Sequence, residues 1–555
     1  MHLDPRIIGR VTATEKMPTT CSTVRFWVHK DQVIRPFDIV RIKHLPRKKG
    51  GRPSYTYALV KELSYITDSS SHLANYVSYD FGDLSVEPHY ERLGTTIAEA
   101  EVLYNDQEIE MPVRDGAAVE WADAEGIKDA LGLRGFKEPI PAGYMLMSNG
   151  EEIPIEFEAA YLLGPEGAHL NIAGISGLAT KTSYVMFLLN SIQQRLKDQV
   201  TIIIFNVKGS DLLAIDQPNP DLTPAQRSEW KKCGLDDKPL ENVTYLYPFA
   251  EKPDSYYTLS HVQPDILEKQ IAEGRAYNYI YDVDTGRRKL ALLFSDIDDP
   301  NSTMESIAHQ LPDIETQSWR AFRTEIRSRA KKGSQKAGEI PIVSWRKFVR
   351  LLETRTHHDL FTERSVTRKE EKRQTLISEA ISNLRSGDVL VIDIEPLPDY
   401  LQCLVFGDVI QIIYGAKLGD EENISGERLG TVVIFADELN KYAPKSRSAT
   451  GRTLTRDLLE ITERGRSLGV VLFGAEQFRS GVHDRILGNC STNIYGRTSA
   501  VEVAKCPDYA HFPRALQSAI TRLPQGSLIL QHAAFTTSLI KTRFPYPNYY
   551  IPRVR

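Results

Sequence analysis

The chain has 555 residues, of which 41% are hydrophobic and 25% are charged. This length corresponds to about three ordinary domains, and the composition excludes a disordered tail, a collagen-like fibre and a coiled-coil rod. A formal net charge of −5 gives no overall basic excess, so any nucleic-acid binding must use local patches. Five scattered cysteines without a CxxC motif indicate reduced thiols rather than a disulfide framework or a zinc site. We expect a cytoplasmic protein with no secretory signal and no membrane span, because no apolar run reaches about 18 residues.

Residues 1–120 contain short runs rich in β-branched and aromatic residues, separated by turn-forming residues. The predicted strands are 7–11, 22–28, 36–42 and 55–63. Short strands at this spacing predict a small β-barrel or sandwich. The loop between the last two strands is basic, and we interpret it as a solvated surface turn. Its cationic residues are Lys43, Arg47, Lys48, Lys49 and Arg52.

From about residue 150 the pattern changes to strands that alternate with helices, which predicts a parallel sheet with helices on its faces. The segment 184–196 is apolar almost all round and therefore predicts a helix buried against this sheet. We expect an α/β core at 121–249 and 386–555, with further strands near its C-terminal end. Its buried strands are predicted at 169–174, 201–205, 388–392, 431–435 and 469–473.

Residues 250–385 interrupt this alternation and are more polar. Helix patterns occur at 318–331, 344–354 and 367–384, and the last of these carries a single apolar stripe. We expect a mostly helical insertion within the α/β core. The basic stretch 331–336 is interpreted as a solvated loop.

The segment from Gly174 to Ser183 lies between a predicted buried strand and a predicted buried helix. That context is typical of a phosphate-binding loop, in which Lys181 would contact the β- and γ-oxygens and Thr182 would bind Mg²⁺. The pattern departs from G-x-x-x-x-G-K-[ST], because it has one residue more and Thr180 replaces the glycine before the lysine. A plain strand–helix turn with an exposed lysine is the alternative. The residues predicted to bind the nucleotide are Gly174, Ser176, Gly177, Leu178, Ala179, Thr180, Lys181, Thr182 and Ser183.

Two acids, Asp437 and Glu438, follow the apolar run 431–436. In phosphoryl-transfer sites the first such acid holds the Mg²⁺ shell and the second polarises the attacking water. The carboxyl ends of parallel strands are also where open α/β sheets bind their ligands. Together with Lys181, the acid pair predicts a nucleotide hydrolase.

A third pattern joins a helix end to a strand that finishes at Gln477. Gln477, beside the acid pair, would sense the γ-phosphate or orient water. Arg464, Arg466 and Arg497 are candidates for an arginine that stabilises transition-state charge across a subunit interface, and Arg466 is preferred. The alternative for Arg464 and Arg466 is that they are helix C-terminal cations that stabilise the helix dipole.

These motifs resemble those of HerA-type ATPases, in the HerA/FtsK branch of hexameric DNA-translocating motors. Asp437 and Glu438 are similar to the Walker B acids of that family, and the segment 463–477 is similar to its helix end and sensor glutamine. Weaker similarities are the N-terminal strands, which resemble a barrel shared with rotary ATP synthases, and the segment 202–209, which ends N-x-K-G where the family has D-x-K-G. The Pro-rich stretch 541–547 resembles the closing strand and tail. The resemblance covers residues 1–120 and the α/β core and implies a RecA-like fold.

The resemblance also implies partners. It implies an ATP- and Mg²⁺-dependent homo-hexamer that moves double-stranded DNA, with contacts to phosphates that are largely independent of sequence. It further implies an effector protein, a nuclease or a sirtuin-like NADase, that docks on the N-terminal barrel in DNA end processing or antiphage defence. Basic residues just after the acid pair are candidate channel contacts, with an ordinary exposed loop as the alternative. They are Lys441, Lys445, Arg447 and Arg452.

A nucleotide-regulated assembly platform is the second hypothesis for function. In this hypothesis the ring scaffolds and activates an effector, and hydrolysis is slow. The atypical loop favours it, because residues other than glycine tolerate positive φ angles poorly. Stimulation of ATP turnover by duplex DNA distinguishes the motor from the platform.

Overall fold

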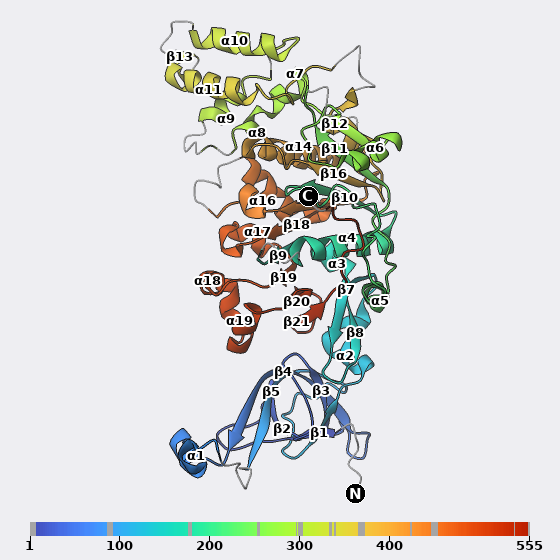
Figure 1. Ribbon diagram of the computed structural model, residues 1–555, viewed down its shortest axis with the longest axis vertical. Helices are drawn as coiled ribbons and strands as arrows, with labels where there is room; N and C mark the ends of the chain where they lie inside the picture. The colour runs from blue at the N-terminus through green and yellow to red at the C-terminus, as the bar shows by residue number, and fades with distance from the viewer. Residues whose placement is uncertain are drawn as a thin grey trace.

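Three regions follow one another along the long axis of the molecule (Figure 1). An N-terminal barrel lies at one end, a large sheet with helices lies in the middle, and a helical segment lies at the other end. The predicted α/β class, with a parallel-rich sheet and an N-terminal barrel, is confirmed. The computed structural model describes residues 7–85, 93–175, 180–251, 256–295, 297, 303–312, 314–331, 336–337, 340–364, 372–421, 424–445, 453–537 and 539–552.

Six antiparallel strands close the N-terminal barrel in the order β1-β2-β5-β4-β3-β6. Side chains alternate between the two faces of a strand, so Val24, Phe26 and Val28 of β2 all point inward and are buried. The four predicted strands correspond to β1–β4, although the third begins at Ile39 rather than at residue 36 and the fourth extends to Thr67; β5 and β6 complete the closure. The six strands are β1 (Ile7–Val11), β2 (Thr23–Val28), β3 (Ile39–His44), β4 (Ser54–Thr67), β5 (Gly94–Asn105) and β6 (Ala118–Trp121).

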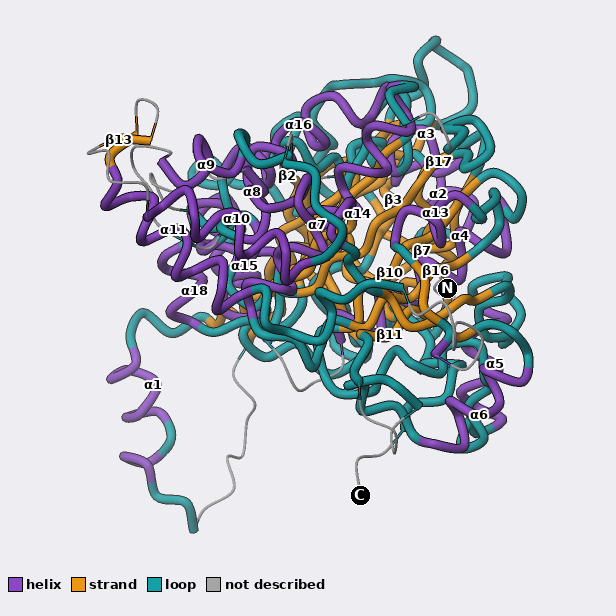
Figure 2. The backbone as a smooth tube through the Cα atoms, turned by 90° about the horizontal axis from the view of Figure 1, so that it is seen from above, coloured by secondary structure: helices purple, strands orange, loops and turns teal. Residues whose placement is uncertain are grey.

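The strands β4 and β5 extend beyond the barrel as a long hairpin that carries α1 (His72–Ser78). Figure 2 shows α1 standing clear of the rest of the molecule. Large exposed apolar patches on a soluble protein commonly mark interaction sites. We call this extension the apolar arm, after its exposed side chains Tyr65, Ile66, Leu73, Tyr76, Val77, Phe81, Leu84 and Leu93.

Thirteen strands form the central sheet, in the order β15-β12-β11-β16-β10-β17-β18-β9-β19-β20-β21-β7-β8. Neighbours from β15 through β19 run parallel, whereas β20, β21, β7 and β8 continue the sheet with antiparallel pairing. The strands are β7 (Pro139–Leu146), β8 (Glu152–Glu158), β9 (Leu170–Ala173), β10 (Val200–Asn206), β11 (Val243–Pro248), β12 (Ala276–Tyr279), β15 (Gln374–Thr375), β16 (Val389–Asp393), β17 (Thr431–Asp437), β18 (Val470–Glu476), β19 (Thr492–Tyr495), β20 (Ser527–His532) and β21 (Ile540–Arg543).

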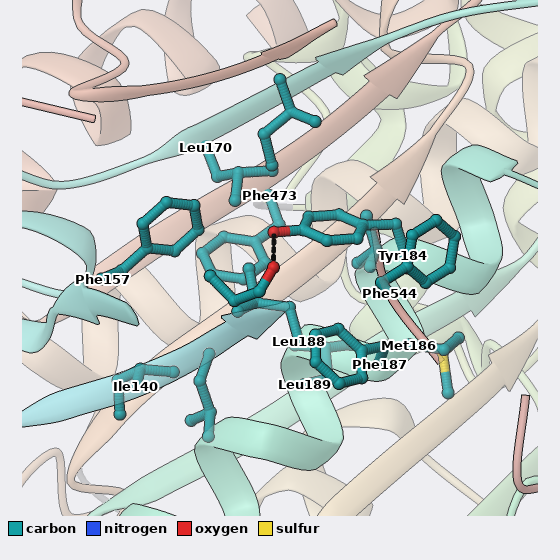
Figure 3. Packing of buried hydrophobic residues seen from close by; sticks show 14 of the residues in the cluster. Ile140, Phe157, Leu170, Tyr184, Met186, Phe187, Leu188, Leu189, Phe473 and Phe544 are labelled. Carbon is teal, nitrogen blue, oxygen red and sulfur yellow. Dashed lines mark hydrogen bonds between the residues drawn. The ribbon is translucent and has the colours of Figure 1, made fainter. Parts of the chain in front are cut away.

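Helices cover both faces of the parallel part of the sheet, which is why its strands are continuous apolar runs. On β10, Ile202 and Ile204 belong to the core that contains α4 (Thr180–Leu196), whereas Ile203 and Phe205 belong to the core on the opposite face. Figure 3 shows α4 in the first core, where the Tyr184 hydroxyl donates a hydrogen bond of 2.9 Å to the Ala142 carbonyl. The helix α4, which follows the predicted phosphate loop, is therefore anchored by apolar packing.

The core on the opposite face is built around α14 (Asp399–Leu418), a 20-residue helix that lies outside the predicted helices. It is buried on most sides and therefore lacks the apolar stripe by which a surface helix is predicted. Among the described residues it is the one helix long and apolar enough to cross a membrane, but 72% of its most apolar window is buried inside the fold.

The range 250–385 holds helices, the last two strands at one side of the main sheet (β15 at the edge and β12 next to it) and a separate two-stranded sheet. The helices α10 (Trp319–Lys331) and α11 (Ile342–Arg355) match the predictions for 318–331 and 344–354. The prediction of one helix at 367–384 is wrong in extent: α13 spans only Ile377–Ser382, and Gln374 and Thr375 pair with β12 instead. Backbone hydrogen bonds to a sheet edge outweigh a weak local helix preference; residues 365–371 lie outside the described part.

The remaining elements connect these layers. They are α2 (Ala124–Leu131), α3 (Ala159–Leu162), α5 (Pro224–Lys232), α6 (Pro264–Ala272), α7 (Val283–Gly286), α8 (Leu290–Leu293), α9 (Thr303–Ala308), β13 (Lys336–Ala337), β14 (Ile340–Pro341), α15 (Leu439–Tyr442), α16 (Thr453–Leu468), α17 (Asp484–Gly488), α18 (Ala500–Lys505) and α19 (Arg514–Ile520).

Candidate nucleotide site

The strand order brings the three sequence motifs to one edge of the sheet. The strand β18 lies between β9, which precedes the phosphate loop, and β17, which carries the acid pair. All three run parallel, so their carboxyl ends meet at the edge where α/β sheets bind ligands. At this edge the Gly174 amide donates to the Glu476 carbonyl at 3.1 Å, and the Ile175 amide donates to the Arg497 carbonyl at 2.7 Å.

Lys181 lies in the first turn of α4, at the helix N-terminus. Its side chain is 4% exposed, and its Nζ makes no hydrogen bond to any described residue. The nearest carboxylate oxygen is Asp437 Oδ1, at 3.9 Å. Burial lowers the pKa of Lys181, and the charges of Asp437 and Glu438 only partly offset this effect. A buried ammonium group without a full partner is costly and is well suited to an anionic ligand.

The other predicted loop residues are only partly described. Ser176, Gly177, Leu178 and Ala179 lie outside the described residues, and Thr180 is described by its backbone alone. Thr182 is half-buried, and its hydroxyl donates to Asp437 Oδ2 at 3.4 Å. Ser183 is buried on the same helix. The hydroxyl of Thr182 is thus the one next to the acid pair.

Asp437 is buried at the end of β17, and Glu438 is half-buried immediately after it. Glu438 has a φ of 58°, a left-handed conformation that is uncommon for residues other than glycine. Its amide donates to Asp437 Oδ1 at 2.9 Å. Backbone strain of this kind clusters at functional sites.

Lys208 joins the acid pair from the loop after β10. Its Nζ lies 2.5 Å from Glu438 Oε1 and 3.8 Å from Asp437 Oδ2. Burial acts to raise the pKa of Glu438, but the hydrogen bond and charge of Lys208 outweigh it and hold that pKa below its usual value. Gln477 also donates to Glu438 Oε1, at 3.4 Å. Lys208 was outside the predicted site, although its place two residues beyond a buried strand was a usable signal.

Glu476, one residue before Gln477, forms a separate buried network. Its side chain is inaccessible to solvent, and burial raises its pKa to about 8. Asn171 donates to Glu476 Oε2 at 2.8 Å and accepts a hydrogen bond from the buried Arg479. Arg479 also pairs with Asp508 at 2.5 Å. None of these four residues was predicted as part of the site, because only the fold brings them together.

The three candidate arginines lie at two edges of the sheet: Arg464 and Arg466 at one, and Arg497 at the other. Arg466 donates to the carbonyl of Glu166, which precedes β9, and so lies at the amino edge, away from Lys181. Arg464 is exposed two residues earlier at the end of the same helix. Arg497 is exposed at the carboxyl edge, directly after β19, and donates to the Thr521 carbonyl at 3.2 Å. Only Arg497 lies beside the phosphate loop of its own chain.

The candidate channel lysines are ion-paired within the chain. Lys441 Nζ lies 2.5 Å from Asp399 Oδ1, and Lys445 Nζ lies 2.6 Å from Asp484 Oδ1. Arg447 and Arg452 lie outside the described residues. The two described lysines are therefore already neutralised by carboxylates.

The described part of the site fits a nucleotide and a magnesium ion. The unpartnered Nζ of Lys181 matches a phosphate oxygen, and the oxygens of Thr182 and Asp437 are the ligand type that Mg²⁺ prefers. No cluster of three or more His, Cys, Asp or Glu side chains suited to a metal occurs among the described residues. Magnesium bound here would take few protein ligands and complete its shell from phosphates and water.

No protein-family model matches the sequence, and no curated protein matches it. Solved structures with a similar fold include the plasmid coupling protein TrwB in complex with ADP and Mg²⁺, with 13% identity, a TM-score of 0.42, and 69% of this chain and 87% of that chain covered. VirB4 of Thermoanaerobacter pseudethanolicus has 11% identity, a TM-score of 0.41, and coverages of 74% and 97%. The genome packaging NTPase B204 from Sulfolobus turreted icosahedral virus 2, in complex with ATP-gammaS, has 14% identity, a TM-score of 0.22, and coverages of 31% and 72%. The likeness is distant, and the assignment of the site depends on its own geometry.

Proposed function

We propose that this chain is an ATPase of the HerA/FtsK type that hydrolyses ATP at the carboxyl edge formed by β9, β18 and β17. The observation that carries the proposal is the buried Nζ of Lys181 at the N-terminus of α4, which makes no hydrogen bond to a described residue and lies 3.9 Å from its ion-pair partner Asp437. A helix N-terminus and a buried cation together form an anion site. The resemblance of the acid pair and the sensor glutamine to the HerA family supports it.

The residues divide the chemistry among them. Lys181 would neutralise the β- and γ-phosphates, and Thr182 and Asp437 would hold Mg²⁺, which supplies charge stabilisation when bound. Glu438, kept ionised by Lys208, would accept a proton from the attacking water, and Gln477 would orient that water. Loss of γ-phosphate release in Lys181→Ala, with release retained in Lys197→Ala, tests this assignment. Lys197 is an exposed lysine beyond the far end of α4 that pairs with Glu241.

We propose that six copies form a closed ring in which an arginine of one subunit completes the site of the next. Arg466 is exposed at the edge opposite to its own site, as an arginine acting on a neighbour would be, and Arg497 is the competing candidate. Inactive Arg466→Ala and Lys181→Ala subunits, when mixed, should regain activity, because some interfaces then pair an intact lysine with an intact arginine. Mixtures that stay inactive despite proven exchange would exclude Arg466, and the same test with Arg497→Ala follows.

The proposed work of the ring is the movement of double-stranded DNA. The family resemblance supports this, and it requires that duplex DNA stimulate ATP turnover. The second candidate function, an assembly platform, is favoured by the atypical phosphate loop. It requires slow turnover that is indifferent to DNA and rises with a partner. Turnover measured with and without duplex DNA decides between them.

We propose the N-terminal barrel as the docking site of an effector protein, a nuclease or a sirtuin-like NADase, in a defence or DNA-processing role. The exposed side chains of the apolar arm support this, because they lack cover in the described chain. Replacing Leu73 and Phe81 by serine should abolish co-purification of the effector from the native host. Serine at the exposed Val33 and Met17, elsewhere on the barrel, is the matched control.

A further inference from the structure

The helices α10 and α11 concentrate positive charge at the end of the molecule opposite the barrel (Figure 1). Their two spans, Trp319–Lys331 and Ile342–Arg355, contain nine lysine or arginine residues and two acids, in a chain whose net charge is −5. A local excess of this size on an acidic protein is what a polyanion-binding surface requires.

The two helices pack against each other through apolar side chains. Six of their cations are exposed, namely Arg320, Arg327, Arg329, Arg346, Lys347 and Arg350. Phe322 and Ile326 of α10 and Phe348 and Leu352 of α11 are buried in one core. Residues three, four and seven apart lie on one face of a helix, so Arg320 and Arg327 share a face of α10, and Arg346, Arg350 and Glu353 share a face of α11.

Two contacts show that these two helices lie side by side. The Arg327 guanidinium donates to Glu353 Oε1 at 2.6 Å, and Arg323 donates to the Thr356 carbonyl at 2.8 Å. The cations of both helices therefore flank a single outer face. At 1.5 Å per residue, α10 gives this face a length of roughly 20 Å, which is long enough to meet several phosphates of a duplex.

Four cations on this hairpin are not neutralised by any neighbour that the structure describes. Arg320, Arg346, Lys347 and Arg350 are exposed, and none forms an ion pair with another described residue. By contrast, Lys441 and Lys445 each form an ion pair with an aspartate. Charges that lack an internal partner can release counterions when they bind phosphates.

We propose that the outer face of the α10–α11 hairpin binds the phosphate backbone of a nucleic acid, through Arg320, Arg346, Lys347 and Arg350. This surface would hold the nucleic acid that stimulates ATP turnover in the proposed function, on which the proposal rests. Binding is electrostatic, independent of base sequence and weakened by salt. It places nucleic acid at the end of the molecule away from the apolar arm.

The test compares two full-length variants that lose the same charge at opposite ends of the chain. One replaces Arg320, Arg346, Lys347 and Arg350 by glutamine, and the other, as the matched control, replaces Arg47, Lys48, Lys49 and Arg52 of the barrel loop. The readout is fluorescence anisotropy with a labelled 30-base-pair DNA duplex, an RNA duplex of the same length, and single-stranded DNA between 50 and 200 mM salt. Melting temperature and turnover without DNA verify that both variants are folded.

We expect the hairpin variant to bind at least about 10-fold more weakly at 50 mM salt, with a shallower dependence on salt, and the barrel variant to bind like wild type. Comparison of the DNA and RNA duplexes identifies which backbone is preferred. Unchanged binding by the hairpin variant would overturn the inference, as would wild-type protein that binds neither nucleic acid; an acidic protein would then be the partner to test. Nucleic-acid binding that depends on the hairpin, in a protein that hydrolyses no ATP, would support the proposed binding surface and contradict the proposed ATPase activity.

Discussion

Two glutamates, Glu438 and Glu476, lie at the ends of neighbouring strands at the same edge of the sheet. They differ in burial, in hydrogen-bond partners and in the direction of their pKa shift. Glu438 follows β17, is half-buried and faces Lys208, which holds its pKa below the usual value. Glu476 ends β18, is fully buried, and has a pKa of about 8 because burial disfavours its charge. One carboxylate is kept ionised at neutral pH, and the other is largely protonated.

In the proposed mechanism this difference separates the carboxylate that does chemistry from the one that supports the fold. An ionised, accessible carboxylate next to a water-orienting amide can take a proton from water. A buried carboxyl bonded to Asn171 can instead fix the strand from which the phosphate loop begins. Pairs of titratable groups whose environments push their pKa values apart identify acid and base roles. Substitutions of Lys181, Lys208 and Glu476 test this division.

Lys181→Ala should have the largest effect. The substitution removes the only described cation that lies buried beside both Asp437 and Glu476, so we expect ATP turnover to fall by at least about 100-fold and nucleotide affinity to fall as well. A phosphate-release assay and a fluorescent-nucleotide titration measure the two effects. Wild-type turnover in this variant would show that the loop does not bind phosphate.

Lys208→Met should reduce turnover less, by about 10-fold, and should change its pH dependence. Without the ammonium group of Lys208, burial is opposed only by the charge of Lys181 and the hydrogen bond from Gln477. The pKa of Glu438 should therefore rise, and the acidic limb of the pH–rate profile should move to higher pH. Lys208→Arg is the control and should restore the wild-type profile. An unmoved limb in Lys208→Met would mean that Glu438 is not the group that titrates.

Glu476→Gln should leave turnover within about 3-fold of wild type and change stability instead. The folded protein keeps a proton on Glu476 up to a pH of about 8, whereas the unfolded chain releases it near 4.5. Wild type therefore loses stability as the pH rises between these values. Between pH 5 and pH 8, the free energy of unfolding should fall by about 1–3 kcal/mol less in Glu476→Gln than in wild type.

Denaturant titrations at the two pH values measure this difference. Glu110→Gln, which removes an exposed acid on the barrel side, is the matched control and should follow wild type. If Glu476→Gln kept the wild-type pH dependence of stability, a group other than Glu476 would be the one that titrates. A large loss of turnover in that variant would give Glu476 a part in the chemistry.

The sequence predicted the parts of the site that depend on neighbouring residues. Fully buried strands such as β10 and β17 are recognisable as short apolar runs, and polar residues at their carboxyl ends, such as Asp437 and Glu438, must lie at an edge of the sheet. The barrel was predictable from the spacing of its strands. The order of the strands was not, and that order decides which side chains meet.

The remaining features depend on contacts between distant segments. Lys208 meets Glu438 only because β10 lies next to β17, and Arg479 meets Asn171 across about 300 positions of sequence. The helix α14 is buried on most sides and gives no stripe, and β15 forms only because β12 offers an edge. The ion pairs that neutralise Lys441 and Lys445 follow from the same tertiary packing.

The central claim is that Glu438 activates water at a nucleotide bound by Lys181. The most direct test is Glu438→Gln, in which ATP–Mg²⁺ affinity and single-turnover hydrolysis are measured on the same preparation. The account predicts affinity within about 3-fold of wild type and hydrolysis slower by about 100-fold or more, because the amide keeps the shape and loses the base. Wild-type hydrolysis by this variant would contradict the account, and loss of affinity with residual hydrolysis would exchange the roles of Glu438 and Asp437.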